Sequence, residues 1–223
     1  MRLVIGDILP FAVVVVVSPI NIVAAILLLL SKRAILNASG YLGGFFVGLA
    51  VVVGGLTALA TAVSLDPGSS GLRGASALLL VLGIGLIVVA VWKFHGRPGP
   101  EEPASLPGWM DGIAGFSPGR SFAVGVAIGA GNPKNFAVAL GTAVTVSSAG
   151  LPSAQTIGVL AAYTFSACIG VAAPIVTMLV LGDRADAVLD DWKSWLTRNN
   201  AAMMAVLYLF FGVILIGKYL GAV

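Results

Sequence analysis

Long apolar segments alternate with short polar ones along this chain of 223 residues. A helix needs about 20 apolar residues to cross the hydrocarbon core of a bilayer. The sequence contains long uncharged stretches at residues 8–31, 34–65, 74–92, 135–182 and 199–217, and a turn-like segment at 147–153 interrupts the fourth. Together with residues 121–146, which hold one lysine, this pattern predicts six transmembrane helices.

A short motif occurs twice, each time near the middle of a predicted helix. The first copy reads Ser18-Pro19-Ile20-Asn21-Ile22 and the second reads Asn132-Pro133-Lys134-Asn135-Phe136, so that both contain Pro-x-Asn. Proline lacks a backbone N–H and clashes with the preceding turn, and we therefore expect breaks in helices 1 and 4 at Pro19 and Pro133. Backbone groups freed inside a bilayer must find partners in the protein or in a water-filled cavity.

The motif divides the chain into two halves with three predicted helices each. Residues 1–92 form the first predicted repeat, 93–120 a Pro-rich cytoplasmic linker, and 121–223 the second repeat. Because three is an odd number, equivalent helices must cross the membrane in opposite directions. The predicted fold is an all-α polytopic membrane protein of six helices in two inverted repeats, a plan typical of transporters that bind substrate near the midplane.

Composition and charge agree with this class. Hydrophobic residues make up 59% of the chain, charged residues 9%, and the mean hydropathy is +1.06, which excludes an ordinary soluble domain. Eight Lys and Arg residues fall in predicted loops on one side and three on the other. The positive-inside rule then predicts a plasma-membrane protein with both termini outside, and the net positive charge does not indicate nucleic acid.

Lys134 is the main candidate for binding chemistry. A lysine near the bilayer centre costs about 2.5–3.5 kcal/mol on insertion scales, so it should face a partner or a cavity. Snorkelling to the interface is the alternative, but the central position of Lys134 in its segment argues against it. Together with a half-helix N-terminus, the ammonium suits an anionic or zwitterionic group.

Amide side chains stand beside both predicted breaks. They offer donors and acceptors to a polar ligand, although capping of a half-helix explains them equally well. The predicted substrate-binding residues are Ser18, Asn21, Asn132, Lys134 and Asn135.

Several other chemistries find no support in the sequence. There is no P-loop motif, no Asp or Glu within a predicted span, and no catalytic group set around the single His95. Cys168 is the only cysteine, so neither a disulfide nor a cysteine metal site is available. We expect no enzyme activity, no metal and no cofactor, and Lys134 is the one intramembrane proton carrier on offer.

Three further patterns concern packing. Glycines at 40, 44, 48, 125 and 129 recur at every fourth position and favour close helix–helix contact. Apolar positions between Val188 and Leu196 recur at helical spacing, which fits either an interfacial helix or an extension of the last span. Hydroxyls of Thr and Ser residues in the spans are expected mostly to bond their own helix backbone.

The motifs resemble those of the LysE superfamily of exporters. Pro-x-Asn in span one, the Gly43-Gly44 helix and Asn-Pro-Lys in span four are the matching features. Pro-Lys-Asn, the Pro-rich linker and the lack of intramembrane carboxylates are most similar to the actinobacterial sulfolipid- and glycopeptidolipid-addressing proteins. This resemblance implies export of a cell-envelope lipid, with its anionic headgroup near Lys134 and its tails between helices.

The sequence therefore predicts an exporter, or a facilitator of export, for an anionic amphipathic lipid. An exporter of small amino acids or cations and a non-transporting scaffold for lipid-export machinery are the alternatives. The expected partners are membrane lipids and a lipid or small-molecule substrate. A homodimer and contacts with lipid-synthesis or export proteins are compatible with the sequence.

Overall fold

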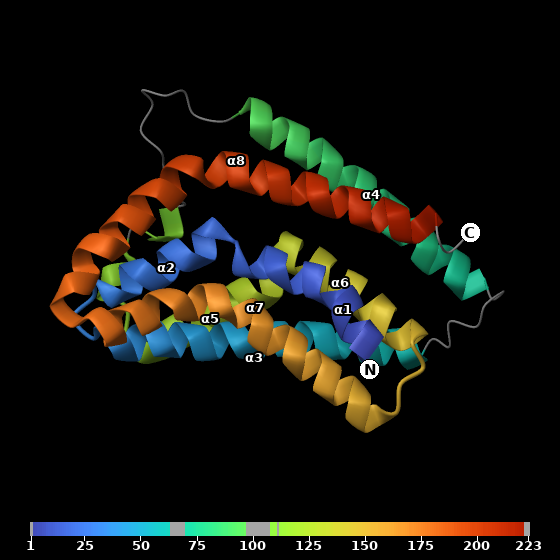
Figure 1. The fold of residues 1–223 in the computed structure, drawn as a ribbon, viewed down its shortest axis with the longest axis horizontal. Helices are drawn as coiled ribbons and strands as arrows, with labels where there is room; N and C mark the ends of the chain where they lie inside the picture. Colours follow the sequence, from blue (N-terminus) through green and yellow to red (C-terminus); the bar gives the residue numbers. More distant parts are fainter. Residues whose placement is uncertain (1, 63–69, 97–107, 111, 221–223) are drawn as a thin grey trace.

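The computed structural model describes residues 2–62, 70–96, 108–110 and 112–220, and every regular element in these ranges is a helix. The elements, in chain order, are α1 (Arg2–Val16), α2 (Pro19–Leu29), α3 (Ala34–Ala62), α4 (Ser70–His95), η1 (Gly108–Met110), η2 (Ile113–Gly115), α5 (Pro118–Gly131), α6 (Pro133–Ser148), α7 (Ser153–Leu181), η3 (Gly182–Arg184) and α8 (Ala185–Leu220). Figure 1 shows them as an elongated bundle in which most helices run along the long axis.

Proline begins the second helix at each Pro-x-Asn motif. Helix α1 ends at Val16 and α2 begins at Pro19, with a bend of 52° between the two helices. Helix α5 ends at Gly131 and α6 begins at Pro133. Proline suits the first turn of a helix because its missing N–H would have no intrahelical partner there.

Length and hydropathy identify membrane-crossing segments in the described part of the chain. Helix α3 and the stretch Ser153–Gly217 both qualify, and the bent pair α1–α2 adds a third span if it is taken as one. Helices α5 and α6, with 14 and 16 residues, are each shorter than a single crossing requires. The chain is a membrane protein, while the six predicted crossings in inverted repeats remain a prediction.

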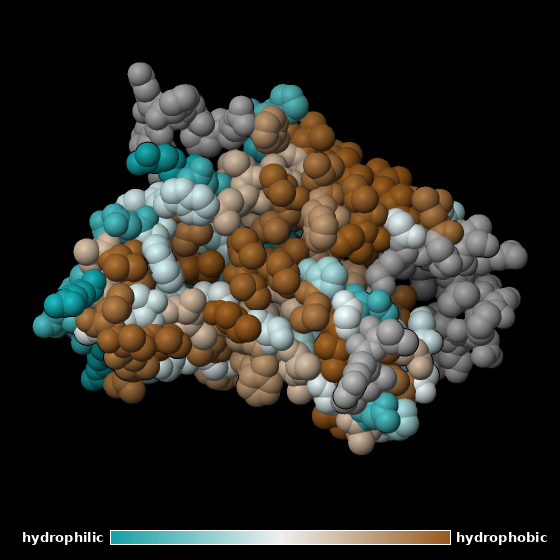
Figure 2. All heavy atoms as spheres, viewed as in Figure 1, coloured by the Kyte–Doolittle hydropathy of each residue, from teal (hydrophilic) through white to brown (hydrophobic). Residues whose placement is uncertain are grey.

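The surface polarity follows the long axis of the bundle. Helix α1 begins and α8 ends at the same end of the molecule, where α6 also turns into α7 (Figure 1). Hydrophilic residues gather at the opposite end, and hydrophobic residues cover the middle of the visible face and the α4–α8 pair (Figure 2). Several large apolar side chains on that pair are exposed, among them Val88 at 62% and Val206 at 63%.

The predicted glycine seam joins α3 to α5. A Cβ added at Gly44 would lie 2.0 Å from the carbonyl oxygen of Phe122, and one at Gly125 would lie 2.2 Å from that of Tyr41. The two backbones therefore approach more closely than any side chain would permit. This confirms the packing role of the repeated glycines.

Two loop predictions have different outcomes. The apolar pattern from Val188 to Leu196 lies within α8, a continuous helix of 36 residues whose two halves differ in direction (Figure 1), which agrees with an extension of the last helix. Of the predicted linker 93–120, residues 97–107 and 111 lie outside the described residues. Within the described part of that linker, Met110 and Ile113 are buried in the core.

The glycine seam leads to a stability prediction. Replacing Gly44 with alanine should force α3 away from α5 and cost about 1–3 kcal/mol or more, as overpacking does in well-packed interiors. The midpoint of thermal unfolding of the purified protein in detergent measures this effect. Gly55→Ala is the matched control, because no heavy atom lies within 4 Å of its added Cβ, and that variant should unfold at or above the parent's temperature. Equal midpoints for the two variants would contradict the seam.

Candidate functional site

Lys134, in the second half of the chain, bonds the backbone next to the break between α1 and α2. Its side chain is 2% exposed, and its Nζ donates to the carbonyl oxygen of Val14 on α1 at 3.0 Å. The neighbouring carbonyls of Val13 and Val15 accept from the backbone N–H groups of Val17 and Ser18. Pro19 has no N–H for the Val15 carbonyl, Ser18 donates there instead of to Val14, and the lysine therefore supplies the donor that Val14 lacks.

The two asparagines of the second motif satisfy backbone groups. Asn132 caps α6, with its Oδ1 accepting from the backbone N–H of Lys134 at 3.0 Å. Asn135 is fully buried, and its Nδ2 donates to the carbonyl of Ile128 in the last turn of α5 at 3.0 Å. The capping explanation is thus confirmed for Asn132, while Asn135 bonds across the break.

Asn21 differs from both. It is fully buried on α2, yet neither its Oδ1 nor its Nδ2 has a hydrogen-bond partner. Ser18, at 1% exposure, precedes α2 as its N-cap residue without a side-chain capping bond. An unpaired amide in an apolar interior costs about 1–3 kcal/mol, so a hydrogen bond to Asn21 would stabilise the protein.

No carboxylate pairs with the Lys134 side chain in the described residues. The one ion pair there joins Lys193 and Asp190, both on α8. An ammonium has three donors, and the Val14 carbonyl takes one of them. The burial of the lysine argues against snorkelling to an interface, and its other two donors have no acceptor among the described residues.

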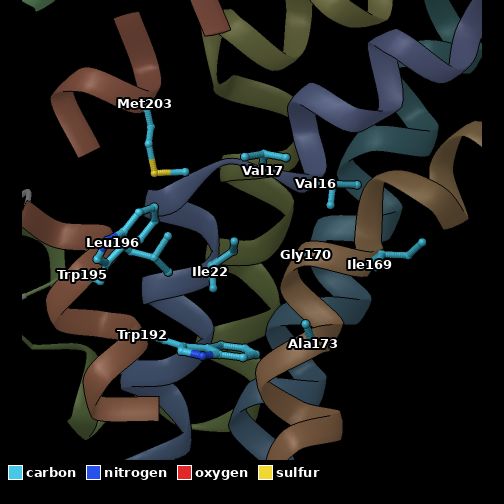
Figure 3. Close-up of a pocket in the computed structure, with 10 residues that line it drawn as sticks. All are labelled: Val16, Val17, Ile22, Ile169, Gly170, Ala173, Trp192, Trp195, Leu196 and Met203. Carbon is cyan, nitrogen blue, oxygen red and sulfur yellow. The ribbon is translucent and has the colours of Figure 1, made fainter. Parts of the chain in front are cut away.

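An apolar pocket of about 400 Å³ begins at the same break. Its walls come from α7 and from the first part of α8, and α2 forms its floor (Figure 3). The side chains of Ile22 and Trp192 point into the space between α7 and α8 (Figure 3). The lining residues are Val16, Val17, Ile22, Ile169, Gly170, Ala173, Trp192, Trp195, Leu196 and Met203. Of these lining residues, Val16 and Val17 follow Val14, the acceptor of the Lys134 hydrogen bond, within one turn along the chain.

The structure thus brings Lys134 to the first break and leaves Asn132 and Asn135 at the second. The pocket was missed by sequence reasoning, although the apolar face of residues 188–196 was the signal that could have found one wall. The threonines behave as expected, since Thr142, Thr164 and Thr177 each donate to a backbone carbonyl four residues earlier. Within the described residues no cluster of His, Cys, Asp and Glu could hold a metal ion.

Comparison with known proteins places this chain in a family. A search of curated proteins found no match, and a search of solved structures found none either. Residues 8–220 match the family model described as Sap, sulfolipid-1-addressing protein, so the match includes both helix breaks, Lys134 and the apolar pocket. The chain therefore belongs to the family of Sap, the sulfolipid-1-addressing protein.

Proposed function

We propose that this protein exports an anionic amphipathic lipid of the cell envelope across the plasma membrane, or assists that export. The observation that supports this most directly is a buried lysine side chain without a carboxylate partner, bonded to α1 at the helix break where an apolar pocket also begins. An ammonium attracts a sulfate, phosphate or carboxylate, and a pocket of this size accommodates part of an acyl chain. The sulfolipid in the family description is a molecule of this kind.

In this proposal Lys134 binds the headgroup and the pocket between α7 and α8 receives a tail. Ser18 and Asn21 lie on the α2 side of the break and complete the polar part of the site. Asn132 and Asn135 hold the second break in shape and thereby position Lys134. The lining of the pocket is apolar throughout, which argues for a lipid over a small amino acid or a cation.

Reciprocal contacts between the halves support two inverted three-helix repeats. Helix α3 of the first half packs on α5 of the second, and α7 of the second half packs on α1 of the first. In both contacts a glycine lies against a carbonyl at a helix crossing: Cβ atoms added at Gly44 and Gly170 would each lie 2.0 Å from an oxygen, that of Phe122 and that of Val16. Helices α3 and α7 have the same length, 29 residues.

The remaining proposals follow from this arrangement. The stretch Ser153–Gly217, 65 residues long, is sufficient for two crossings at 1.5 Å per residue. With the bent pair α1–α2 and the consecutive helices α5 and α6 counted as one crossing each, α3 and α4 bring the total to six. The termini then lie outside by the positive-inside rule. We also propose, from the sequence motifs, that the protein belongs to the LysE superfamily. A homodimer and contacts with lipid-synthesis proteins are proposed as compatible with the sequence.

The function is tested in source cells that lack the gene. Surface-exposed and total polar lipids are compared before and after the gene is restored. We expect one lipid class to disappear from the surface while its total amount is maintained. An unchanged surface distribution would overturn lipid export and favour the small-solute or scaffold alternatives.

Lys134→Met tests the headgroup role in the same assay. Because a hydrogen bond to a charged group contributes about 1.5–3 kcal/mol, the variant should restore surface lipid at least about tenfold less effectively than the parent. Lys193→Met is the control, since that lysine is partly exposed in an ion pair with Asp190. A Lys134→Met protein that is present at parental levels and fully active would refute the headgroup role.

Ala173→Trp tests the tail pocket. The indole would fill space between α7 and α8, and we expect surface lipid to fall severalfold while the unfolding midpoint stays within a few degrees of the parent's. Ala123→Trp is the matched control, because Ala123 is exposed on α5 away from the pocket. Equal export by the two tryptophan variants would show that the pocket does not receive the substrate.

A further inference from the structure

The two helix breaks share one register but use different donors on the equivalent carbonyl. Val14 and Ile128 each lie five residues before the proline of their motif, and Asn21 and Asn135 each lie two residues after it. At the second break the Asn135 amide donates to Ile128. At the first break Lys134 donates to Val14, and the Asn21 amide has no partner.

The residue before the proline has a similar backbone conformation at both breaks. Ser18, before Pro19, has φ −71° and ψ 107°, and Asn132, before Pro133, has φ −75° and ψ 119°. Each proline then occupies the first position of its second half-helix. The relation of Asn21 to Val14 along the chain is thus that of Asn135 to Ile128, where a hydrogen bond of 3.0 Å forms.

We propose that the Val14 carbonyl is a shared acceptor for which Lys134 and Asn21 exchange. Lys134 holds it in the unloaded protein. When an anionic group draws the ammonium away, the Asn21 amide donates to Val14 as Asn135 does to Ile128. The exchange lets the lysine leave without exposing an unsatisfied carbonyl in an interior where water is scarce. It rests on the proposed function only for the identity of the anion.

This assigns Asn21 a positioning role that the second motif does not need. The Ile128 carbonyl has its own amide, so the Lys134 side chain is free to reach across to the other half. In the first motif Asn21 lies at the equivalent position, but the donor to the Val14 carbonyl is Lys134 of the second motif. The unpaired Asn21 is then the donor that bonds the Val14 carbonyl after Lys134 has left it.

Single variants at the equivalent asparagines give the first comparison. Asn135→Leu removes a hydrogen bond from a buried carbonyl and should lower the unfolding midpoint of the purified full chain by about 5 °C. Asn21→Leu removes an amide without a partner and should leave the midpoint unchanged or raise it. A fall of similar size for both would show that Asn21 is already bonded in the unloaded protein, which would overturn the exchange.

A double-mutant cycle between Asn21 and Lys134 is the decisive experiment, performed in detergent without the lipid substrate. Lys134→Met alone should shift the midpoint by less than about 2 °C, because Asn21 replaces the lysine on Val14. In the Asn21→Leu background the same substitution should lower it by about 5 °C or abolish folding, since the Val14 carbonyl then has no donor.

Equal shifts of the midpoint in the two backgrounds would overturn the exchange, and so would a Lys134→Met single variant that fails to fold. Neither result depends on transport, because no substrate is present. Failure of the lipid-distribution test with a synergistic cycle would remove lipid export and leave the exchange standing. An additive cycle together with loss of surface lipid would overturn the exchange and leave lipid export standing.

Discussion

Broken helices in an apolar interior leave backbone carbonyls that must be bonded, and the centre of this protein is arranged around that constraint. Each proline removes one N–H from its helix and ends the hydrogen-bond pattern of the preceding half. In water the exposed carbonyls would be hydrated, but within a membrane protein they require donors from side chains. Asn135 satisfies Ile128 within its own half, and Lys134 satisfies Val14 across the two halves.

The same constraint ties the two halves together. The Lys134–Val14 hydrogen bond joins residues 120 positions apart and fixes α6 against α1. The glycine contacts act alongside it, since each allows a helix of one half to lie directly on the backbone of the other. Any rocking of one half against the other must therefore alter these contacts, and the lysine bond is the one among them that a charged ligand can compete for.

Much of this could be predicted from the sequence, because the signals are local. Proline in the middle of an apolar run predicted where a helix would end, and the four-residue spacing of glycines predicted the α3–α5 seam. The acceptor of Lys134 could not be predicted, because every residue has a backbone carbonyl and the sequence does not show which one lacks a donor. The pocket was missed for a related reason, since its walls come from four helices whose side chains look like ordinary lipid-facing or interfacial residues.

The difference between the two motifs is more informative than their likeness. If the two breaks were equivalent, each asparagine amide would donate to the carbonyl at its own break, and no charged side chain would be needed. Lysine lies between Pro133 and Asn135, where the first motif has Ile20, and its side chain donates to Val14 in the other half of the chain. A buried charge without a counter-ion is costly, and its cost falls when an anion enters. Under the proposed function, this difference between the two motifs at one position is what gives the site its preference for acidic ligands.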